Sequence, residues 1–366
     1  MTSPLAIRAY WSTSALGIGN EETLANLLAG ISPGMQELSG DIPSRSIWFG
    51  AVTAPLPEIK EPKWKFRSCQ LVALAADSLA GEIESIVAKY GARRIAVILG
   101  ASDTGVDEAE RYVDKWIDCG RKPDAFHFEM LELGSPAEFL KARLALEGPA
   151  YVISTACSSS AKVFPAARRL IAAGLCDAAI VGGADSRCRF AMNGFEALGA
   201  LSQGRSRPLA PDRDGINLGE AAALFILDKD TANAMFLFRG AGETSDAYHA
   251  TAPDPEGRGA EAAMRMALED AGLRPEDIDY INLHGTGTVA NDDMELAALS
   301  RVFGEYPQAH AKAVSTKNLT GHTLGASGAI EAAICLDMIA GSRARNALSN
   351  SFAFGGSNAS IILSAS

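Results

Sequence analysis

Three side chains in this sequence could together carry out acyl-transfer chemistry: one cysteine and two histidines. Cys157 lies in the stretch STACSSSAKVFPAARRL, where an apolar run ends and a helical pattern begins. The thiolate is the nucleophilic form of cysteine, and the ordinary thiol pKa is about 8.5. Unpaired backbone N–H groups at the beginning of a helix favour a negative charge, so this position predicts an activated nucleophile. Small neighbours also let a backbone N–H face a bound carbonyl oxygen, as in an oxyanion hole.

The same stretch allows a plainer interpretation, in which Cys157 is a buried structural cysteine at the end of a strand. The stretch alone does not separate the two interpretations. The structural interpretation applies more strongly to the other five cysteines, and the six together are irregularly spaced with no CxxC pair. We expect no disulfide framework and no zinc site among the six, and we interpret the other five as small buried apolar residues. They are Cys69, Cys119, Cys176, Cys188 and Cys335.

The first of the two histidines follows a predicted strand. His284 lies in NLHGTGTVANDDMEL, where Gly285 and Gly287 permit tight backbone turns. Asp292 and Glu295 come where the next helix should begin, and we interpret them as a capping-box-like arrangement. A single histidine in such a place is more often structural than catalytic.

The second histidine lies in a segment of the same type. His322 occupies STKNLTGHTLGASGAIEAA, between a predicted strand and a predicted helix, with Lys317 five residues before it and Glu331 nine residues after it. Like Cys157, both histidines therefore lie in transitions from strand to helix that are rich in small residues. This shared position favours a catalytic interpretation, in which the three side chains converge on one pocket.

A glycine pair near the end of the chain marks a further loop. In NSFAFGGSNASIIL the two glycines follow two phenylalanines and precede a predicted closing strand. Such a loop can bring its backbone close to a ligand. The alternative is an ordinary hairpin turn.

Alternating strands and helices must position these loops. Short apolar runs predict buried strands at residues 94–100, 150–154, 178–182, 222–227, 278–283 and 360–363. Helical patterns lie between them at residues 68–88, 161–173, 259–271 and 329–340. Apolar strands that alternate with helices predict an α/β protein whose sheet is covered on both faces. Pro165 lies inside one predicted helix, where we expect a kink or an irregular turn.

The order of elements around Cys157 recurs around His322. In each case a predicted strand leads to the candidate catalytic residue, Cys157 or His322, and a helix, a glycine and another strand follow. This similarity predicts two related α/β halves, residues 1–230 with the cysteine and residues 231–366 with the histidines.

Composition restricts the function further. The chain has 366 residues, 48% of them hydrophobic, and a formal net charge of −11. That charge disfavours broad binding to nucleic acid or to an anionic membrane surface. We find no signal peptide pattern and no apolar run of about 18 residues that could cross a bilayer, so we expect a cytoplasmic protein.

Seven motifs occur together, and in their common order they resemble the elongating, Cys-His-His type of β-ketoacyl-[acyl carrier protein] synthase in the thiolase superfamily. Four contain or adjoin the residues discussed above: TACSSS, HGTGT, STKNLTGH and FAFGGSN. The other three are GFEALGALS at residues 194–202, SRPLAPDRDGINLGE at 206–220 and SDAYHATAP at 245–253.

The resemblance implies a fold and a reaction. The fold is the thiolase fold, five layers in the order α-β-α-β-α built from two similar halves. The reaction is a decarboxylative condensation, in which Cys157 takes an acyl chain from carrier-bound phosphopantetheine and malonyl-carrier then loses CO2. His284 and His322 would donate hydrogen bonds to the forming enolate. The backbone N–H groups of Cys157 and Phe354 would hold the tetrahedral oxyanion.

The resemblance also implies supporting roles and partners. Lys317 would support the histidine geometry, with Glu331 as its ionic partner. The family acts as a homodimer or as a heterodimer with a related synthase or chain-length factor, and it meets an acyl carrier protein. No metal or organic cofactor is expected beyond the phosphopantetheine that arrives on the carrier. Further predicted residues are Thr251, Thr286 and Thr288 along the pantetheine tunnel, Phe195 and Phe352 in the acyl pocket, Phe354 as its gate, and Lys63, Lys65 and Arg67 for carrier docking.

Some positions depart from the family pattern. Lys162 replaces a common histidine five residues after the nucleophile, Ala353 replaces the glycine before the gating phenylalanine, and Asn291 replaces another glycine. The sequence around Cys157 resembles that of compact synthases of accessory pathways that make polyene or unusual acyl chains. The alternative pathway is housekeeping fatty-acid synthesis. The sequence does not indicate the chain length or saturation of the product.

Two other functions compete with this one. The chain could be a chain-length-factor-like partner of an active synthase, although such subunits usually lose the nucleophile. It could also be a thioesterase or a thiolase-like acyltransferase. A thiolase would have a second active-site cysteine near the C-terminus, whereas Cys335, the one late cysteine, lies in a predicted helix.

Overall fold

The computed structural model describes residues 3–43, 45–304 and 312–366, and in these residues one continuous sheet of eleven strands forms the centre of the molecule. Along this sheet the order is β12-β11-β13-β14-β10-β1-β9-β7-β5-β6, and the short β2 pairs with β1. The strands are β1 (Leu5–Ser14), β2 (Gly17–Ile18), β5 (Ile95–Gly100), β6 (Ala150–Ile153), β7 (Ala178–Asp185), β9 (Ala221–Asp228), β10 (Phe236–Ser245), β11 (Tyr280–Asn282), β12 (Ala313–Val314), β13 (Asn346–Ala353) and β14 (Ser357–Ala365). A small separate sheet contains β3 (Met35–Leu38), β4 (Ile47–Gly50) and β8 (Leu218–Gly219).

The large sheet consists of the same five-strand pattern twice. The order β6-β5-β7-β9-β1 in the first copy corresponds to β12-β11-β13-β14-β10 in the second, with the same parallel and antiparallel pairings. The copies meet where residues 5–7 of β1 pair antiparallel with residues 236–238 of β10. The expected pair of repeated α/β halves is therefore present. The division into residues 1–230 and 231–366 stays a prediction.

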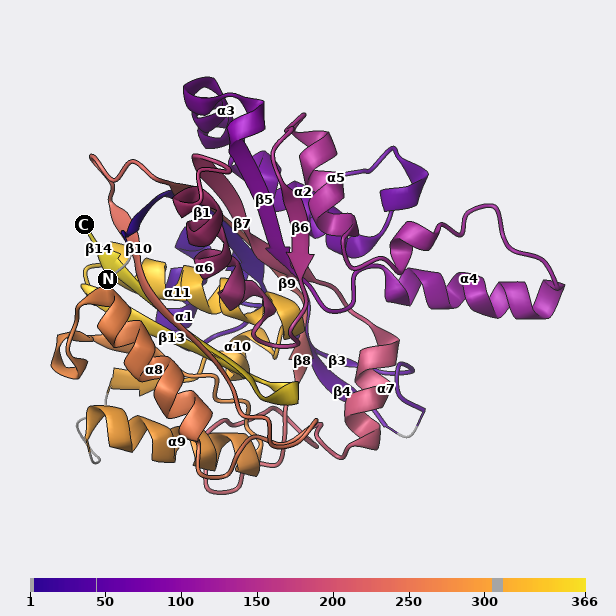
Figure 1. Cartoon of the computed structure of the whole chain (residues 1–366). Helices are drawn as coiled ribbons and strands as arrows, with labels where there is room; N and C mark the ends of the chain where they lie inside the picture. The colour runs from indigo at the N-terminus through magenta and orange to yellow at the C-terminus, as the bar shows by residue number, and fades with distance from the viewer. Residues whose placement is uncertain (1–2, 44, 305–311) are drawn as a thin grey trace.

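Helices complete five layers. Helices α6 (Ser159–Ala172) and α11 (Ser327–Ala340) contact each other and lie between the two halves of the sheet. Helices α2 (Arg67–Ser78) and α5 (Ser135–Arg143) cover the outer face of the first half, and α8 (Arg258–Ala271) and α9 (Val289–Phe303) cover that of the second (Figure 1). The expected α-β-α-β-α order is confirmed. The remaining helices are α1 (Asn20–Ala29), α3 (Ala80–Tyr90), α4 (Val106–Cys119), α7 (Arg189–Ala197) and α10 (Lys317–Thr320).

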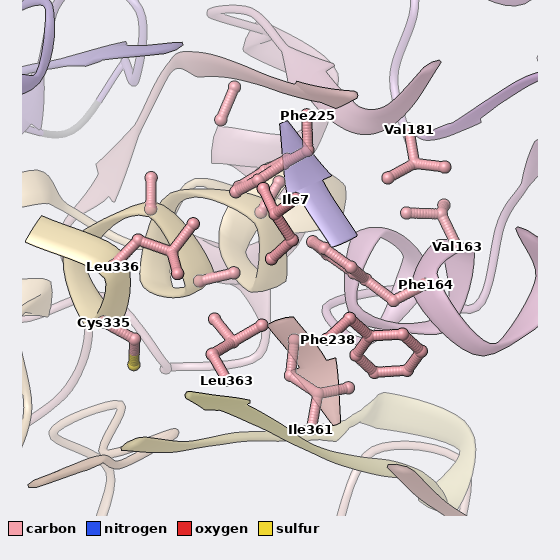
Figure 2. Packing of buried hydrophobic residues seen from close by; sticks show 14 of the residues in the cluster. Ile7, Val163, Phe164, Val181, Phe225, Phe238, Cys335, Leu336, Ile361 and Leu363 are labelled. Atoms are coloured by element: carbon pink, nitrogen blue, oxygen red, sulfur yellow. The ribbon is translucent and has the colours of Figure 1, made fainter. Parts of the chain in front are cut away.

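The central layer holds the largest apolar cluster. Phe164 of α6 lies with its ring centroid 5.0 Å from that of Phe225 on β9 and 5.6 Å from that of Phe238 on β10, so one helix side chain bridges both half-sheets (Figure 2). Each fully buried side chain of this size stabilises the fold by about 1.5–3 kcal/mol. The core thus fixes the beginning of α6, which follows Cys157, against α11, which follows His322. No helix among the described residues combines the length and apolar character that crossing a bilayer requires.

The structure corrects two predicted helices. The predicted helix 68–88 is two helices, α2 and α3, separated at Leu79, which has non-helical backbone angles. The second correction concerns Pro165, where α6 continues without the irregular turn that was the alternative to a kink, and a kink of the helix axis stays a prediction. There Pro165 is buried among residues packed on the sheet.

Among the described strands, the apolar-run criterion missed the longer β1, β10 and β13 and also the short β2, β3, β4, β8 and β12. Strand β10 alternates buried and half-buried residues and contains two glycines. A Cβ on Gly240 would lie 2.5 Å from the carbonyl oxygen of Ala267, and one on Gly242 would lie 2.0 Å from that of Ala263. Helix α8 therefore packs directly on the strand backbone, which explains why apolar side chains are missing from this part of the strand.

Candidate active site

The structure brings Cys157, His284 and His322 together, although they are far apart in sequence. One ligand-type atom from each, the cysteine sulfur and a nitrogen of each imidazole, lies within 4.8 Å of the other two. The imidazole centroids are 5.4 Å apart with the rings nearly perpendicular, at 87°. All three side chains are buried. Cys157 follows β6, His284 follows β11 and His322 follows α10, so each lies at the end of a regular element.

The surroundings of Cys157 differ in one respect from the sequence expectation. The chain turns sharply at Ala156, whose φ is 51°, and α6 begins at Ser159, so the predicted strand-to-helix transition is present. Burial raises the pKa of the Cys157 thiol to about 11, whereas the charge of Lys317 and backbone hydrogen bonds from Phe354 and from Cys157 itself lower it. Burial therefore outweighs the stabilisation of the thiolate that we expected from the helix N-terminus. These two backbone N–H groups lie close enough to the sulfur to lower its pKa, whereas an oxyanion hole needs them to face the carbonyl oxygen of a bound acyl group.

Hydrogen bonds determine which nitrogen of His322 carries a proton. The backbone N–H of Leu324 donates to Nδ1 of His322 at 3.1 Å, and the hydroxyl of Ser327 lies 3.1 Å from the same atom. Burial, followed by the charge of Lys317, lowers the imidazole pKa well below its usual value. His322 is therefore a neutral imidazole whose Nδ1 is an acceptor and whose Nε2 carries the hydrogen.

His284 reaches the same state by a different contact. The Lys317 ammonium, which can only donate, lies 3.4 Å from Nδ1 of His284. Burial, then Lys317 and His322, lower the His284 pKa well below its usual value. The site therefore holds two neutral imidazoles, each with an Nε2–H donor, which suits the stabilisation of a developing negative charge on oxygen.

Lys317 and Glu331 form a buried ion pair beside these rings. The Lys317 ammonium also donates to the carbonyl oxygen of His284 at 2.6 Å, so it fixes both the backbone and the ring of that histidine. Burial raises the pKa of Glu331 to about 7, and Lys317 opposes that shift. Cysteine and histidine are also ligands of zinc. Here the adjacent ammonium repels a second cation, so the electrostatics of the site disfavour a metal.

Sequence reasoning missed the role of Glu295. Instead of capping its own helix, its carboxylate accepts the backbone N–H of His284 at 2.8 Å and of Gly285 at 2.7 Å, together with the Asn350 amide at 3.2 Å. Asp292 likewise accepts the N–H of Gly287 at 3.2 Å. The capping-box interpretation is therefore wrong, because both carboxylates point back to the histidine loop. Their spacing of three residues on one helix face, next to a glycine-rich loop, was the available signal.

Replacing Glu295 by alanine should destabilise the protein strongly. Each buried N–H left without an acceptor costs about 1–3 kcal/mol, so the free energy of unfolding should fall by about 3 kcal/mol. Urea unfolding followed by tryptophan fluorescence measures this change. The exposed Glu269 on α8 provides the control, and its alanine variant should stay within about 0.5 kcal/mol of the wild type. Equal effects of the two substitutions would contradict the anchoring role of Glu295.

A cavity of about 260 Å³ opens beside the three central residues. Its wall includes all of the predicted tunnel and acyl-pocket residues, with Leu198, Ile216 and Pro253 in addition. The Phe354 ring lies 5.7 Å from that of Phe195. The predicted residues in the wall are Thr251, Thr286, Thr288, Phe195, Phe352 and Phe354.

The predicted docking cations lie outside this cavity. Arg67 donates twice to the buried Glu220 carboxylate, at 2.7 and 2.5 Å, and once to the Val52 carbonyl at 3.2 Å. Its guanidinium therefore pairs with a buried carboxylate while remaining partly exposed, and its role in carrier docking stays a prediction. Lys63 lies over the Trp64 ring, with its ammonium 4.1 Å from the ring centroid, and Lys65 is exposed.

Most of the chain is similar to known proteins. Residues 92–233 match the family Beta-ketoacyl synthase, N-terminal domain, and residues 235–348 match Beta-ketoacyl synthase, C-terminal domain. The chain is 34% identical over 286 residues to 3-oxoacyl-[acyl-carrier-protein] synthase 2 of Staphylococcus aureus, covering 75% of this chain and 71% of the relative. The protein with the same description from Coxiella burnetii is 34% identical over 315 residues, covering 75% and 76%.

Two solved structures extend the similarity over the whole chain. One is a ketosynthase (ApeO) in complex with its chain length factor (ApeC) from Xenorhabdus doucetiae, with a TM-score of 0.94, 39% identity and coverage of 99% of this chain and 98% of that one. The other is the ishigamide ketosynthase/chain length factor, with a TM-score of 0.88, 27% identity and full coverage of both chains.

Proposed function

Because the chain belongs to the β-ketoacyl synthase family, we propose that it condenses an acyl chain with malonyl-carrier protein to give 3-oxoacyl-carrier protein and CO2. The observation that supports this most directly is the pair of neutral imidazoles beside a cysteine, each with Nδ1 engaged as an acceptor. Two N–H donors facing one oxygen stabilise an enolate, which is the species formed when malonyl loses CO2.

The reaction divides into three steps. First, the Cys157 sulfur attacks the carrier thioester, the carbon–sulfur bond to pantetheine breaks, and the proton of the Cys157 thiol passes to the leaving pantetheine sulfur. Second, the malonyl C–C bond to the carboxylate breaks, CO2 leaves, and the electron pair forms an enolate held by His284 and His322. Third, the enolate carbon bonds to the acyl carbonyl, and Cys157 sulfur leaves as the thiolate. Backbone N–H groups of Cys157 and Phe354 hold the oxyanion in the first and third steps.

The remaining predicted residues have supporting roles in this proposal. Lys317, paired with Glu331, positions His284. Threonines and phenylalanines of the cavity wall hold the pantetheine arm and the acyl chain. The carrier protein brings the phosphopantetheine, so the proposal needs no resident cofactor. The candidates for carrier docking remain Lys63, Lys65 and Arg67. A cytoplasmic location stays a prediction of the sequence.

We further propose a heterodimer with a chain-length factor. The 39% identity to a ketosynthase solved with its chain length factor supports this over a homodimer. In such a pair this chain would be the catalytic member, because it has the cysteine and both histidines in one site. The product chain could belong to fatty-acid-, polyketide- or aryl-polyene-type elongation.

Thiolase-like acyl transfer without decarboxylation has less support. Cys335 is fully buried within α11, and it is absent from the described wall of the cavity that contains Cys157. The second active-site cysteine of a thiolase therefore has no counterpart among the described residues of that wall.

Product analysis tests the proposed function. The protein, alone and with a chain-length factor, is incubated with acyl-carrier and malonyl-carrier, and the carrier is then examined by mass spectrometry. The proposal predicts a 3-oxoacyl chain two carbons longer than the starting chain, with one CO2 per product. Transfer of the acyl chain without CO2 release, with and without the partner, would contradict it.

A further inference from the structure

Lys162 joins the helix that follows Cys157 to the turn that carries Phe354. It lies at the end of the first turn of α6, and its ammonium donates to the hydroxyl of Ser357 at 2.7 Å. Ser357 is the first residue of β14 and directly follows the turn Phe354–Gly356. Its hydroxyl also lies 3.1 Å from that of Ser158, which is next to the nucleophile. The Ser357 side chain thus connects the Phe354 turn with Ser158, just before α6, and with Lys162 within α6.

This lysine contact has no carboxylate partner. Among the described residues Lys162 takes part in no ion pair, and the nearby Glu243 pairs with Arg169 at 2.6 Å. Burial lowers the pKa of Lys162, and the charge of Glu243 opposes that shift without reversing it. A hydrogen bond from an ammonium is stronger than one between neutral groups, so this contact helps to fix the beginning of β14 relative to α6.

Strand pairing restrains both ends of the turn that precedes Ser357, because Ala353 pairs with Ser357 and Ser357 also pairs with Ser245 of β10. Gly355 and Gly356 have φ values of 80° and 73°, so two successive residues adopt the left-handed conformation. On one side the turn is held by backbone hydrogen bonds, from Gly355 N–H to the Ala250 carbonyl at 2.8 Å and from Asp246 N–H to the Gly356 carbonyl at 2.9 Å. On the side of Cys157, Lys162 and Ser158 supply the side-chain contacts to Ser357.

We propose that Lys162 is a positioning residue that, through Ser357, keeps the backbone N–H of Phe354 directed at Cys157. The inference rests on the proposed function, because that N–H serves as an oxyanion donor only if Cys157 is acylated. Lys162 contacts no reacting atom in this account. Its loss should therefore slow the steps that use the Phe354 donor and leave the decarboxylation at His284 and His322 unchanged.

Two rates measured on the same variants test this inference. Acylation of Cys157 by acyl-carrier is followed by intact-protein mass spectrometry, and CO2 release from malonyl-carrier is followed separately. Lys162→Met should slow acylation about tenfold, the change produced by a loss of about 1.4 kcal/mol of transition-state stabilisation. Decarboxylation should remain within about twofold of the wild type. Lys162→Arg should restore most of the acylation rate, because guanidinium can also donate to the Ser357 hydroxyl.

Three further variants separate positioning from a general structural role. Ser357→Ala should slow acylation about as much as Lys162→Met. The variant with both changes should be no slower than either single variant, because each change breaks the same contact between Lys162 and Ser357. Lys312→Met removes a lysine hydrogen bond to the Ile278 carbonyl and should change neither rate. Equal losses in both rates, additive effects in the double variant, or no loss in Lys162→Met would overturn the inference. A wild-type protein that never acylates Cys157 would instead refute the proposed function.

Discussion

Replacing Cys157 by alanine should abolish formation of the acyl-enzyme. Among the described residues, the Cys157 thiol is the thiol that lies beside both imidazoles and near two backbone N–H groups, so its removal leaves no thiol in the site. We expect intact-protein mass spectrometry to show a covalent acyl adduct on the wild type and none on the variant. Condensation should fall by at least about 10⁴-fold, the scale seen when a catalytic nucleophile is removed.

The control for this prediction is another buried cysteine. Cys335→Ala removes a buried sulfur in α11 outside the cavity and should leave the adduct in place. Peptide mapping of the labelled wild type should find the acyl group on Cys157. An adduct that persists in Cys157→Ala would move the nucleophile elsewhere and break the proposed mechanism.

Replacing either histidine by alanine should stop decarboxylation far more than acylation. Each change removes one Nε2–H donor from the enolate, and the loss of one such donor slows catalysis by about 10²–10³-fold. Release of CO2 from malonyl-carrier measures that step. The rate of acylation should fall by less than about tenfold, because its oxyanion is held by backbone groups of Cys157 and Phe354.

Glutamine provides the graded comparison for the histidines. His322→Gln keeps an N–H donor, although a less well placed one, and should retain more decarboxylation than His322→Ala. Thermal unfolding of each variant shows whether the fold survives. Equal losses of acylation and decarboxylation in folded variants would mean that the histidines shape the pocket rather than stabilise the enolate.

The convergence of the three central residues could be predicted from their similar positions, although the short helix α10 lies between the predicted strand and His322. Cys157, His284 and His322 each follow a regular element and precede a helix. In the sequence, small residues on both sides of each reactive side chain indicate such a loop. The repeated halves were also visible, since strand, reactive loop, helix and glycine recur in order. These features are local, and local patterns predict local geometry.

Contacts between distant segments could not be predicted in this way. Glu295 resembles an ordinary residue in the first part of a helix, and only the folded chain brings its carboxylate to the backbone of His284. Arg67 lies in a basic stretch, yet its guanidinium pairs with the carboxylate of Glu220, which is 153 residues away. The contact from Lys162 to Ser357 spans 195 residues and leaves no periodic signal.

Burial also changed one electrostatic expectation. From the sequence, Cys157 at the beginning of a helix should have a favoured thiolate. In the fold, the loss of solvent raises the thiol pKa to about 11 despite Lys317 and the backbone donors. Sequence position indicates which dipoles face a group, but desolvation depends on tertiary packing.

A single-turnover experiment tests the central claim most directly. Enzyme carrying an acyl chain on Cys157 is isolated and mixed with malonyl-carrier, and the acyl-enzyme mass and the released CO2 are followed together. We predict that both change with one time course and in equal amounts, and that the chain appears on the carrier extended by two carbons. Loss of the chain as free acid without CO2, or CO2 release while the chain stays on Cys157, would contradict condensation at this site.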